Sequence, residues 1–185
     1  MFFAVLLSAL FGSLVLQHFL GAVPPWGARV FLMPVIFFYG ALSLSTNAML
    51  VLAFVCGFFW DILHVQWVDD AMELGVGWSV IAYAVLGALM SGLRPLFLRG
   101  RWEVHCLFSG VATSVLVALE YVMLSLRREP LRFEFSPGIW GRILGAGLVA
   151  LVLSPLVFVV LGYLARLVGH RHYRPERGED AARGL

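Results

Sequence analysis

Four ionisable side chains lie inside otherwise apolar segments of the chain: Asp61, His64, Glu120 and Arg142. In a membrane helix, a charged side chain at the helix centre costs about 2.5–3.5 kcal/mol, so such groups face protein or water rather than lipid. Asp61 and His64 are three residues apart and share one face of a helix. Arginine is the natural bidentate partner of a carboxylate. We therefore treat these four residues as candidates for a buried polar cluster that couples helices or partners.

Three interpretations of this cluster follow from its chemistry. It can be a network of ion pairs and hydrogen bonds that holds helices together, or it can line an outward-facing cavity for a partner or ligand. A metal site would be built on Asp61 and His64, which supply two ligands, whereas zinc takes three or four protein ligands. We therefore expect no metal and no cofactor.

The patterns of the common catalytic sites are missing from the sequence. No HExxH pattern occurs, and Asp61 is the only aspartate in the apolar segments, so neither a zinc protease nor an aspartyl dyad is indicated. Ser109-Gly110 lacks the flanking residues of a nucleophile elbow, and His105 has no suitable acid on its helix. We expect a protein that is not an enzyme.

Composition identifies the class of protein. The chain has 185 residues, of which 61% are hydrophobic, and a mean hydropathy of +0.92. Soluble domains are about 45–50% apolar, so the chain is an integral membrane protein. The net charge of +2 is too small to suggest nucleic-acid binding. Cys56 and Cys106 lie inside apolar segments at different depths, and we expect both to pack without forming a disulfide.

Apolar stretches of about 20 residues predict an all-α fold with about six transmembrane helices. The predicted helices span residues 2–21, 28–44, 48–67, 76–97, 104–126 and 139–168. They form a single polytopic domain, residues 1–168, followed by a polar tail, residues 169–185, that we expect to be disordered. Pro34 is expected to kink the second helix. An acidic loop with Asp69, Asp70 and Glu73 follows the third.

With six spans, the third and fifth helices run outward and the sixth runs inward. The four ionisable residues then lie near one level beneath the outer face. Arginine counting places both termini in the cytoplasm, because the arginines near residues 94–101 and those of the tail fall on one side.

Small residues at helical spacing predict close contacts between helices. The first helix carries Ala4, Ser8 and Gly12, a stripe that suits either intramolecular packing or the docking of a partner. The other predicted packing positions are Gly57, Ala84, Ala88, Gly92, Gly141 and Gly145.

Residues 29–97 resemble the rod shape-determining protein MreD family. The family pattern is an apolar helix with a proline, a short turn, and a helix that ends in Gly-apolar-apolar-apolar-Asp. The matching positions here are Pro34, Gly57 and Asp61, with Gly75 in the following segment. The acidic residues 69–73 and the arginine-rich stretch after the fifth helix depart from this pattern.

The resemblance implies a non-catalytic scaffold of the bacterial cell-elongation machinery in the cytoplasmic membrane. Its implied partners are MreC, the MreB filament, RodA and a penicillin-binding transpeptidase. The family's membrane fold is similar to the substrate-binding subunits of energy-coupling-factor transporters. A vitamin-like small-molecule binder of a transporter is therefore the alternative function, in which the first-helix stripe would dock a transporter subunit.

Overall fold

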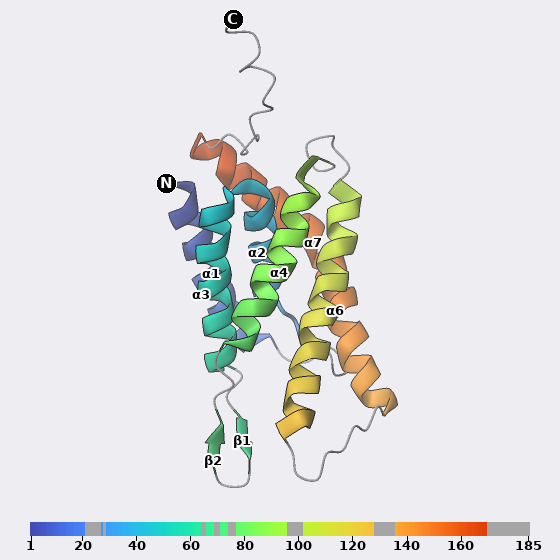
Figure 1. Ribbon diagram of the computed structural model, residues 1–185. Coiled ribbons are helices and arrows are strands. Elements are labelled where there is room, and N and C mark those ends of the chain that lie inside the picture. The colour runs from blue at the N-terminus through green and yellow to red at the C-terminus, as the bar shows by residue number, and fades with distance from the viewer. Residues whose placement is uncertain are drawn as a thin grey trace, which may run out of the picture.

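A computed structural model describes residues 1–20, 27, 29–63, 66–68, 71–73, 77–95, 102–127 and 136–169. This part of the chain folds into six helices and one β-hairpin (Figure 1). The helices are α1 (Phe2–Phe19), α2 (Met33–Ser43), α3 (Thr46–Leu63), α4 (Trp78–Gly92), α6 (Trp102–Arg127) and α7 (Pro137–Leu167). The strands are β1 (Gln66–Val68) and β2 (Ala71–Glu73).

Three of the described helices are long and apolar enough to cross a membrane. These spans are Thr46–Leu63 in α3, Glu103–Met123 in α6 and Pro137–Leu167 in α7. The apolar stretches of the other three helices are shorter than 18 residues. They are Phe2–Gln17 in α1, Met33–Ser43 in α2 and Trp78–Gly92 in α4. The protein is therefore an α-helical membrane protein.

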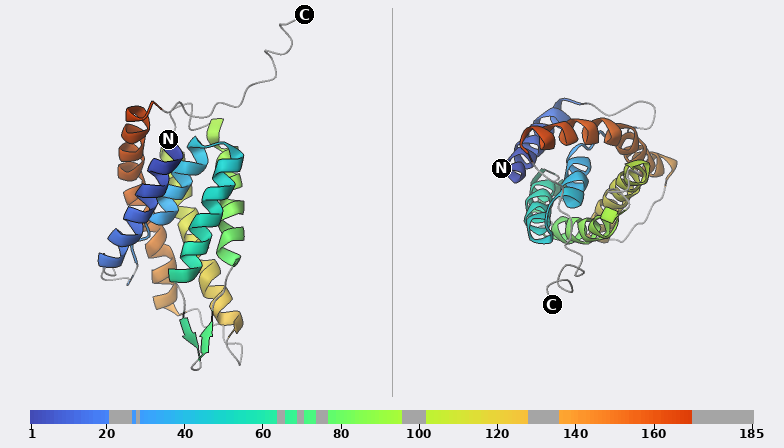
Figure 2. Two further views of the ribbon diagram at one scale, coloured as in Figure 1. Left: turned by 90° about the vertical axis from the view of Figure 1, so that its left-hand side faces the viewer. Right: turned by 90° about the horizontal axis from the view of Figure 1, so that it is seen from above.

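The short helix α2 lies at the centre of the bundle. All 11 of its residues are buried, and it contacts α1, α3, α4, α6 and α7. Seen from above, the other helices surround it (Figure 2). A helix that is apolar on every side is stable only when every side is covered, and here the cover is protein rather than lipid.

The predicted kink at Pro34 is wrong, because α2 begins at Met33 and Pro34 lies in its first turn. A proline in the first turn costs no hydrogen bond, since those backbone N–H groups have no partner within the helix. Residues 29–32 were predicted to be helical but precede the helix. Pro34 therefore marks where the central helix starts.

The third predicted helix is shorter than expected. It ends at Leu63, and Gln66–Val68 forms a strand that pairs antiparallel with Ala71–Glu73. Trp67 lies opposite Met72 in this pairing. The hairpin projects beyond the helices at the end where α3 finishes and α4 begins, which we call the hairpin end (Figure 1). Asp69, Asp70, Gly75 and His64 lie outside the described residues.

Several small residues allow helix backbones to meet. A Cβ on Gly57 of α3 would clash with the backbone of Val80 and would lie 2.8 Å from the carbonyl carbon of Ser79 on α4. A Cβ on Gly147 of α7 would clash with Ser114 Oγ and lie 2.7 Å from Gly110 O on α6. Gly110 and Gly147 were not among the predicted packing positions, and a side chain at either would clash across the contact between α6 and α7.

The remaining predicted packing positions divide between the inside and the outside of the bundle. Gly145 is buried, Gly141 is half-buried and Ala84 packs against the core. The exposed ones are Ala4, Ser8, Gly12, Ala88 and Gly92. A Cβ on Gly12 or Gly92 would meet nothing within 4 Å. The α1 stripe is therefore exposed in the part of the chain that the structure describes, and Phe2, Leu6 and Leu10 form the packed face of that helix.

Candidate functional site

Asp61 lies in the last turn of α3 and binds the start of the next helix. Its Oδ2 accepts a hydrogen bond of 2.7 Å from the backbone N–H of Gly77, the N-cap residue of α4. Gly77 has a φ of 110°, a conformation that favours glycine. The N-terminal N–H groups of a helix lack partners within the helix, and its dipole favours negative charge there. Asp61 thus supplies the capping carboxylate that α4 does not carry itself.

Gly57 lies one turn before Asp61, on the same face of α3. Its lack of a side chain lets the backbone of Ser79 and Val80 approach the α3 backbone closely. We call Gly57 and Asp61 the α4 seat. Gly57 provides the space and Asp61 provides the hydrogen bond, so together they fix where the chain re-enters the bundle after the hairpin.

Beside the α4 seat, an aromatic group connects α2, α3 and α4. Tyr83 of α4 is fully buried, with its ring centroid 5.0 Å from that of Phe37 and 6.1 Å from that of Trp60. Its hydroxyl has no hydrogen-bond partner among the described residues. The carboxylates of Asp61 and Glu120 both lie close enough to act electrostatically on this hydroxyl.

The predicted cluster is therefore placed as follows. Asp61 and Glu120 are half-buried and both lie near Tyr83. Arg142 is exposed on α7, and His64 lies outside the described residues. An ion-pair cluster of all four residues stays a prediction. Tyr83, a buried polar residue, was not among the candidates of the sequence analysis. Nothing in the spacing of Tyr83 within its apolar segment marks it as a fully buried polar residue.

A second polar site lies at the opposite end of the bundle, on Arg94. Its side chain is only 6% exposed, and its guanidinium donates to the carbonyl oxygens of Ala41, at 3.1 and 2.8 Å, and Leu44. Ser91 Oγ donates to Ala41 O at 3.1 Å. These carbonyls end α2, where acceptors are unpaired and the helix dipole favours a cation.

The sequence analysis took Arg94 for an arginine of a cytoplasmic loop. One signal in the sequence distinguishes Arg94 from the loop arginines Arg99 and Arg101. Arg94 lies between Leu93 and Pro95, next to the apolar segment and several residues before Arg99. Asp61 and Arg94 are therefore a matched pair of helix caps. One carboxylate stabilises the positive end of α4, and one guanidinium stabilises the negative end of α2.

The inner face of α6 carries further polar groups. His105, Ser109 and Thr113 are fully buried at four-residue spacing. Thr113 Oγ1 donates to Ser109 O at 2.8 Å, and His105 Nε2 lies 3.2 Å from Leu93 O on the α4 side. The polar atoms of His105 and Thr113 are thus engaged with backbone groups, which is the usual state of polar groups in a membrane interior.

No group of three or more His, Cys, Asp or Glu side chains among the described residues could hold a metal ion. Comparison of the chain with family models, with curated proteins and with solved structures found no match.

Proposed function

We propose that the chain is a non-catalytic membrane scaffold of the bacterial cell-elongation machinery, of the MreD kind. The observation that carries this proposal is the α4 seat. Gly57 and Asp61, two of the residues on which the resemblance rests, act together at one helix junction. The third, Pro34, starts the helix around which the others pack. Two of the resembling residues thus act at one helix junction, and the third begins the central helix, which supports the resemblance.

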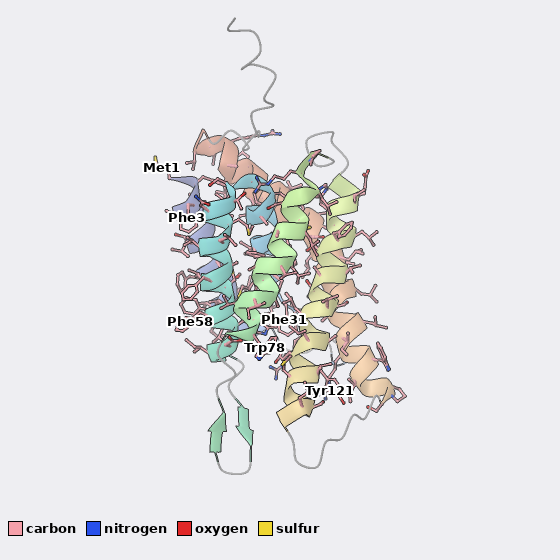
Figure 3. The ribbon with its side chains drawn as sticks, in the orientation of Figure 1. Met1, Phe3, Phe31, Phe58, Trp78 and Tyr121 are labelled. Carbon is pink, nitrogen blue, oxygen red and sulfur yellow. The ribbon has the colours of Figure 1, made fainter. Side chains whose placement is uncertain are left out.

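We further propose that all six described helices lie in the bilayer. Helix α2 is too short to span it alone, at about 16 Å, but protein surrounds it, and non-helical backbone is tolerated at membrane depth when protein buries it. Trp78 is exposed at the start of α4, near the hairpin (Figure 3). Trp140 is exposed in the first turn of α7. Exposed tryptophans are typical of the membrane–water interface, so the hairpin lies outside the bilayer.

The proposed contact for the membrane anchor of MreC is the outer side of α1. Ala4, Ser8 and Gly12 are exposed there, and four-residue spacing of small residues suits the close approach of another helix. The anchor would link the scaffold to MreB on the cytoplasmic side and to RodA and its transpeptidase. Both termini would be cytoplasmic in the inner membrane.

Co-purification tests this proposal. The tagged chain is co-expressed with the MreC protein of the same genome, and recovery of MreC is measured in mild detergent. We expect MreC to co-purify with the unaltered chain and with Ala88→Leu, which changes an exposed small residue on α4. We expect Ser8→Leu to lower its recovery by about tenfold, because a large side chain separates the helices.

Failure of the unaltered chain to bind MreC would remove the scaffold proposal, as would unchanged rod shape after depletion of the protein from cells. Full binding by Ser8→Leu would remove only the α1 contact. Mass spectrometry of the purified protein addresses the transporter alternative. A stoichiometric vitamin-like ligand would favour that function over the scaffold.

A further inference from the structure

Helices α3 and α4 are short for a bilayer. Helix α4 has 15 residues and α3 has 18, which correspond to lengths of about 22 and 27 Å. The hydrocarbon core of a bilayer is about 30 Å thick. Protein covers α2 on every side, but α3 and α4 carry exposed apolar side chains along their outer surfaces. These surfaces meet the acyl chains directly, so their height matters.

The exposed apolar surface of the two helices is shorter still. On α3, the large exposed apolar side chains begin at Leu50 and end at Leu63, about 20 Å along the axis. Residues 45–47, which precede them, are exposed and polar. On α4 they run from Trp78 to Leu89, about 16 Å. We call this surface of the two helices the α3–α4 face.

Helix α7 has the opposite mismatch. It has 31 residues and is about 46 Å long. Its exposed apolar side chains continue from Leu144 to Leu167, about 35 Å. In Figure 1, and in the view from above in Figure 2, α7 runs obliquely across the bundle. Tilting fits a long apolar helix into a bilayer. Since tilting only lowers the height of a helix, it cannot adapt the α3–α4 face.

A short helix can also reach the headgroups with long charged side chains at its ends. Asp61 is the only charged residue of α3 and α4, and Arg94 follows α4. Hydrogen bonds within the bundle hold both, Asp61 to Gly77 and Arg94 to the end of α2. The ways that remain are a thinner bilayer or a covering protein. The exposed, stacked rings of Phe54 and Phe58 on α3 favour acyl chains, because close helix contacts need small residues.

We propose that the bilayer is locally thinned where it meets the α3–α4 face, and that this face selects phospholipids with short acyl chains. Such a thinned zone also attracts membrane proteins whose spans are equally short, because sharing it reduces the amount of deformed lipid. This lipid preference rests on the proposed crossing of the bilayer by α3 and α4. It does not involve the partner contact on α1.

Thermal unfolding in bilayers of defined thickness tests the lipid preference. The full chain is reconstituted into nanodiscs of monounsaturated phosphatidylcholines whose chains have fourteen, eighteen or twenty-two carbons. We expect the unfolding midpoint to be highest with fourteen carbons and to fall by about 5–10 °C at twenty-two. A midpoint that is highest with the longer chains, or that does not change with chain length, would overturn the proposal.

Two matched double variants assign the effect to one face. Thr46→Leu with Asn47→Leu extends the apolar surface of α3 by about one turn, and should move the highest midpoint from fourteen to eighteen carbons. Ser136→Leu with Gly138→Leu extends the start of α7, which can tilt further, and should keep the profile of the unaltered chain. Equal shifts in the two variants would show that the α3–α4 face is not the origin.

A measurement of depth supports or overturns the proposal without these variants. In a background that lacks the native cysteines, nitroxide labels are attached to Leu50→Cys and Ile62→Cys on α3, and to Val152→Cys in the middle of α7. In eighteen-carbon nanodiscs, a water-soluble relaxation agent should reach both α3 labels and not the α7 label, because thinning brings both headgroup regions to α3. Shielding of either α3 label would overturn local thinning. If the hairpin and the tail were still labelled from opposite sides of the membrane, the proposed crossings would stand.

Discussion

A missing side chain at Gly57 is what allows α4 to meet α3. Gly57→Ala would place a methyl group against the backbone of Ser79 and Val80, which cannot rotate away as a side chain can. We expect this variant to lose about 1–3 kcal/mol of stability through overpacking, seen as a lower unfolding midpoint in detergent.

The matched control is Gly12→Ala, because a Cβ there meets nothing within 4 Å. In a helix interior alanine is favoured over glycine by about 0.5–1 kcal/mol, so the control should be neutral or slightly stabilised. Equal losses in the two variants would show that α3 and α4 are not in this close contact.

We expect Asp61 to stabilise the start of α4 in two ways: its carboxylate oxygen accepts the hydrogen bond from Gly77, and its negative charge favours the positive end of the helix. Asp61→Ala removes both and should cost about 1–2 kcal/mol, as the loss of a helix N-cap does. Asp61→Asn keeps an acceptor for the Gly77 N–H and should retain part of that stability. The measurement is the unfolding midpoint of both variants. If Asp61→Asn were as damaging as Asp61→Ala, the charge rather than the hydrogen bond would carry the interaction.

At the scale of the element, the central helix α2 depends on one side chain from outside it. Arg94 satisfies the carbonyl oxygens of Ala41 and Leu44 in an apolar interior. Arg94→Gln would leave these buried acceptors without the guanidinium donors and should cost about 1–3 kcal/mol, as the loss of a partner from buried hydrogen-bonding groups does. Protease resistance and recovery of folded protein in detergent report this loss.

Arg94→Lys should recover only part of the stability, because an ammonium group lacks the planar fork that reaches several carbonyls. Arg166→Gln is the control, since that arginine is exposed in the last turn of α7. A loss of equal size in this control would mean that net positive charge, rather than the cap on α2, maintains the fold.

The sequence predicted the helices where each one coincides with a long apolar segment. The predicted helix at residues 104–126 became Trp102–Arg127, and the one at 139–168 became Pro137–Leu167. The strand Gln66–Val68 was missed because its residues continue the apolar run of α3. Hydropathy reports that a segment avoids water, and it does not report where one backbone conformation changes into another.

The faces of the helices were less predictable than their ends. In a soluble protein, polar residues mark the outside, but in a bilayer both faces of a helix are apolar. Ala4, Ser8 and Gly12 therefore gave no sign of lying on the outer side of α1. For the same reason the contacts that Arg94 and Tyr83 make with α2 could not be predicted from the sequence.

At the scale of the whole molecule, the number of crossings decides on which side of the membrane each end lies. Helices α1 to α7 alternate in direction, so α1 begins and α7 ends at the end opposite the hairpin (Figure 1). If all six described helices cross the bilayer, the hairpin and the tail lie on opposite sides. If only α3, α6 and α7 cross, the hairpin follows the first crossing and the tail the third, which puts them on the same side.

Cysteine labelling separates these two arrangements in the full chain. In a background that replaces the two native cysteines, Cys56 and Cys106, by alanine, Asp70→Cys marks the hairpin segment and Arg177→Cys marks the tail. With six crossings and cytoplasmic termini, a membrane-impermeant maleimide should label Asp70→Cys in intact cells and Arg177→Cys only after permeabilisation. Labelling of both variants in intact cells, or of neither, would place the two positions on the same side of the membrane. An even number of helices would then cross between them, so at least one of α4, α6 and α7 would not span the bilayer. The buried, surrounded position of α2 and the exposed tryptophans at the starts of α4 and α7 favour the six-crossing result.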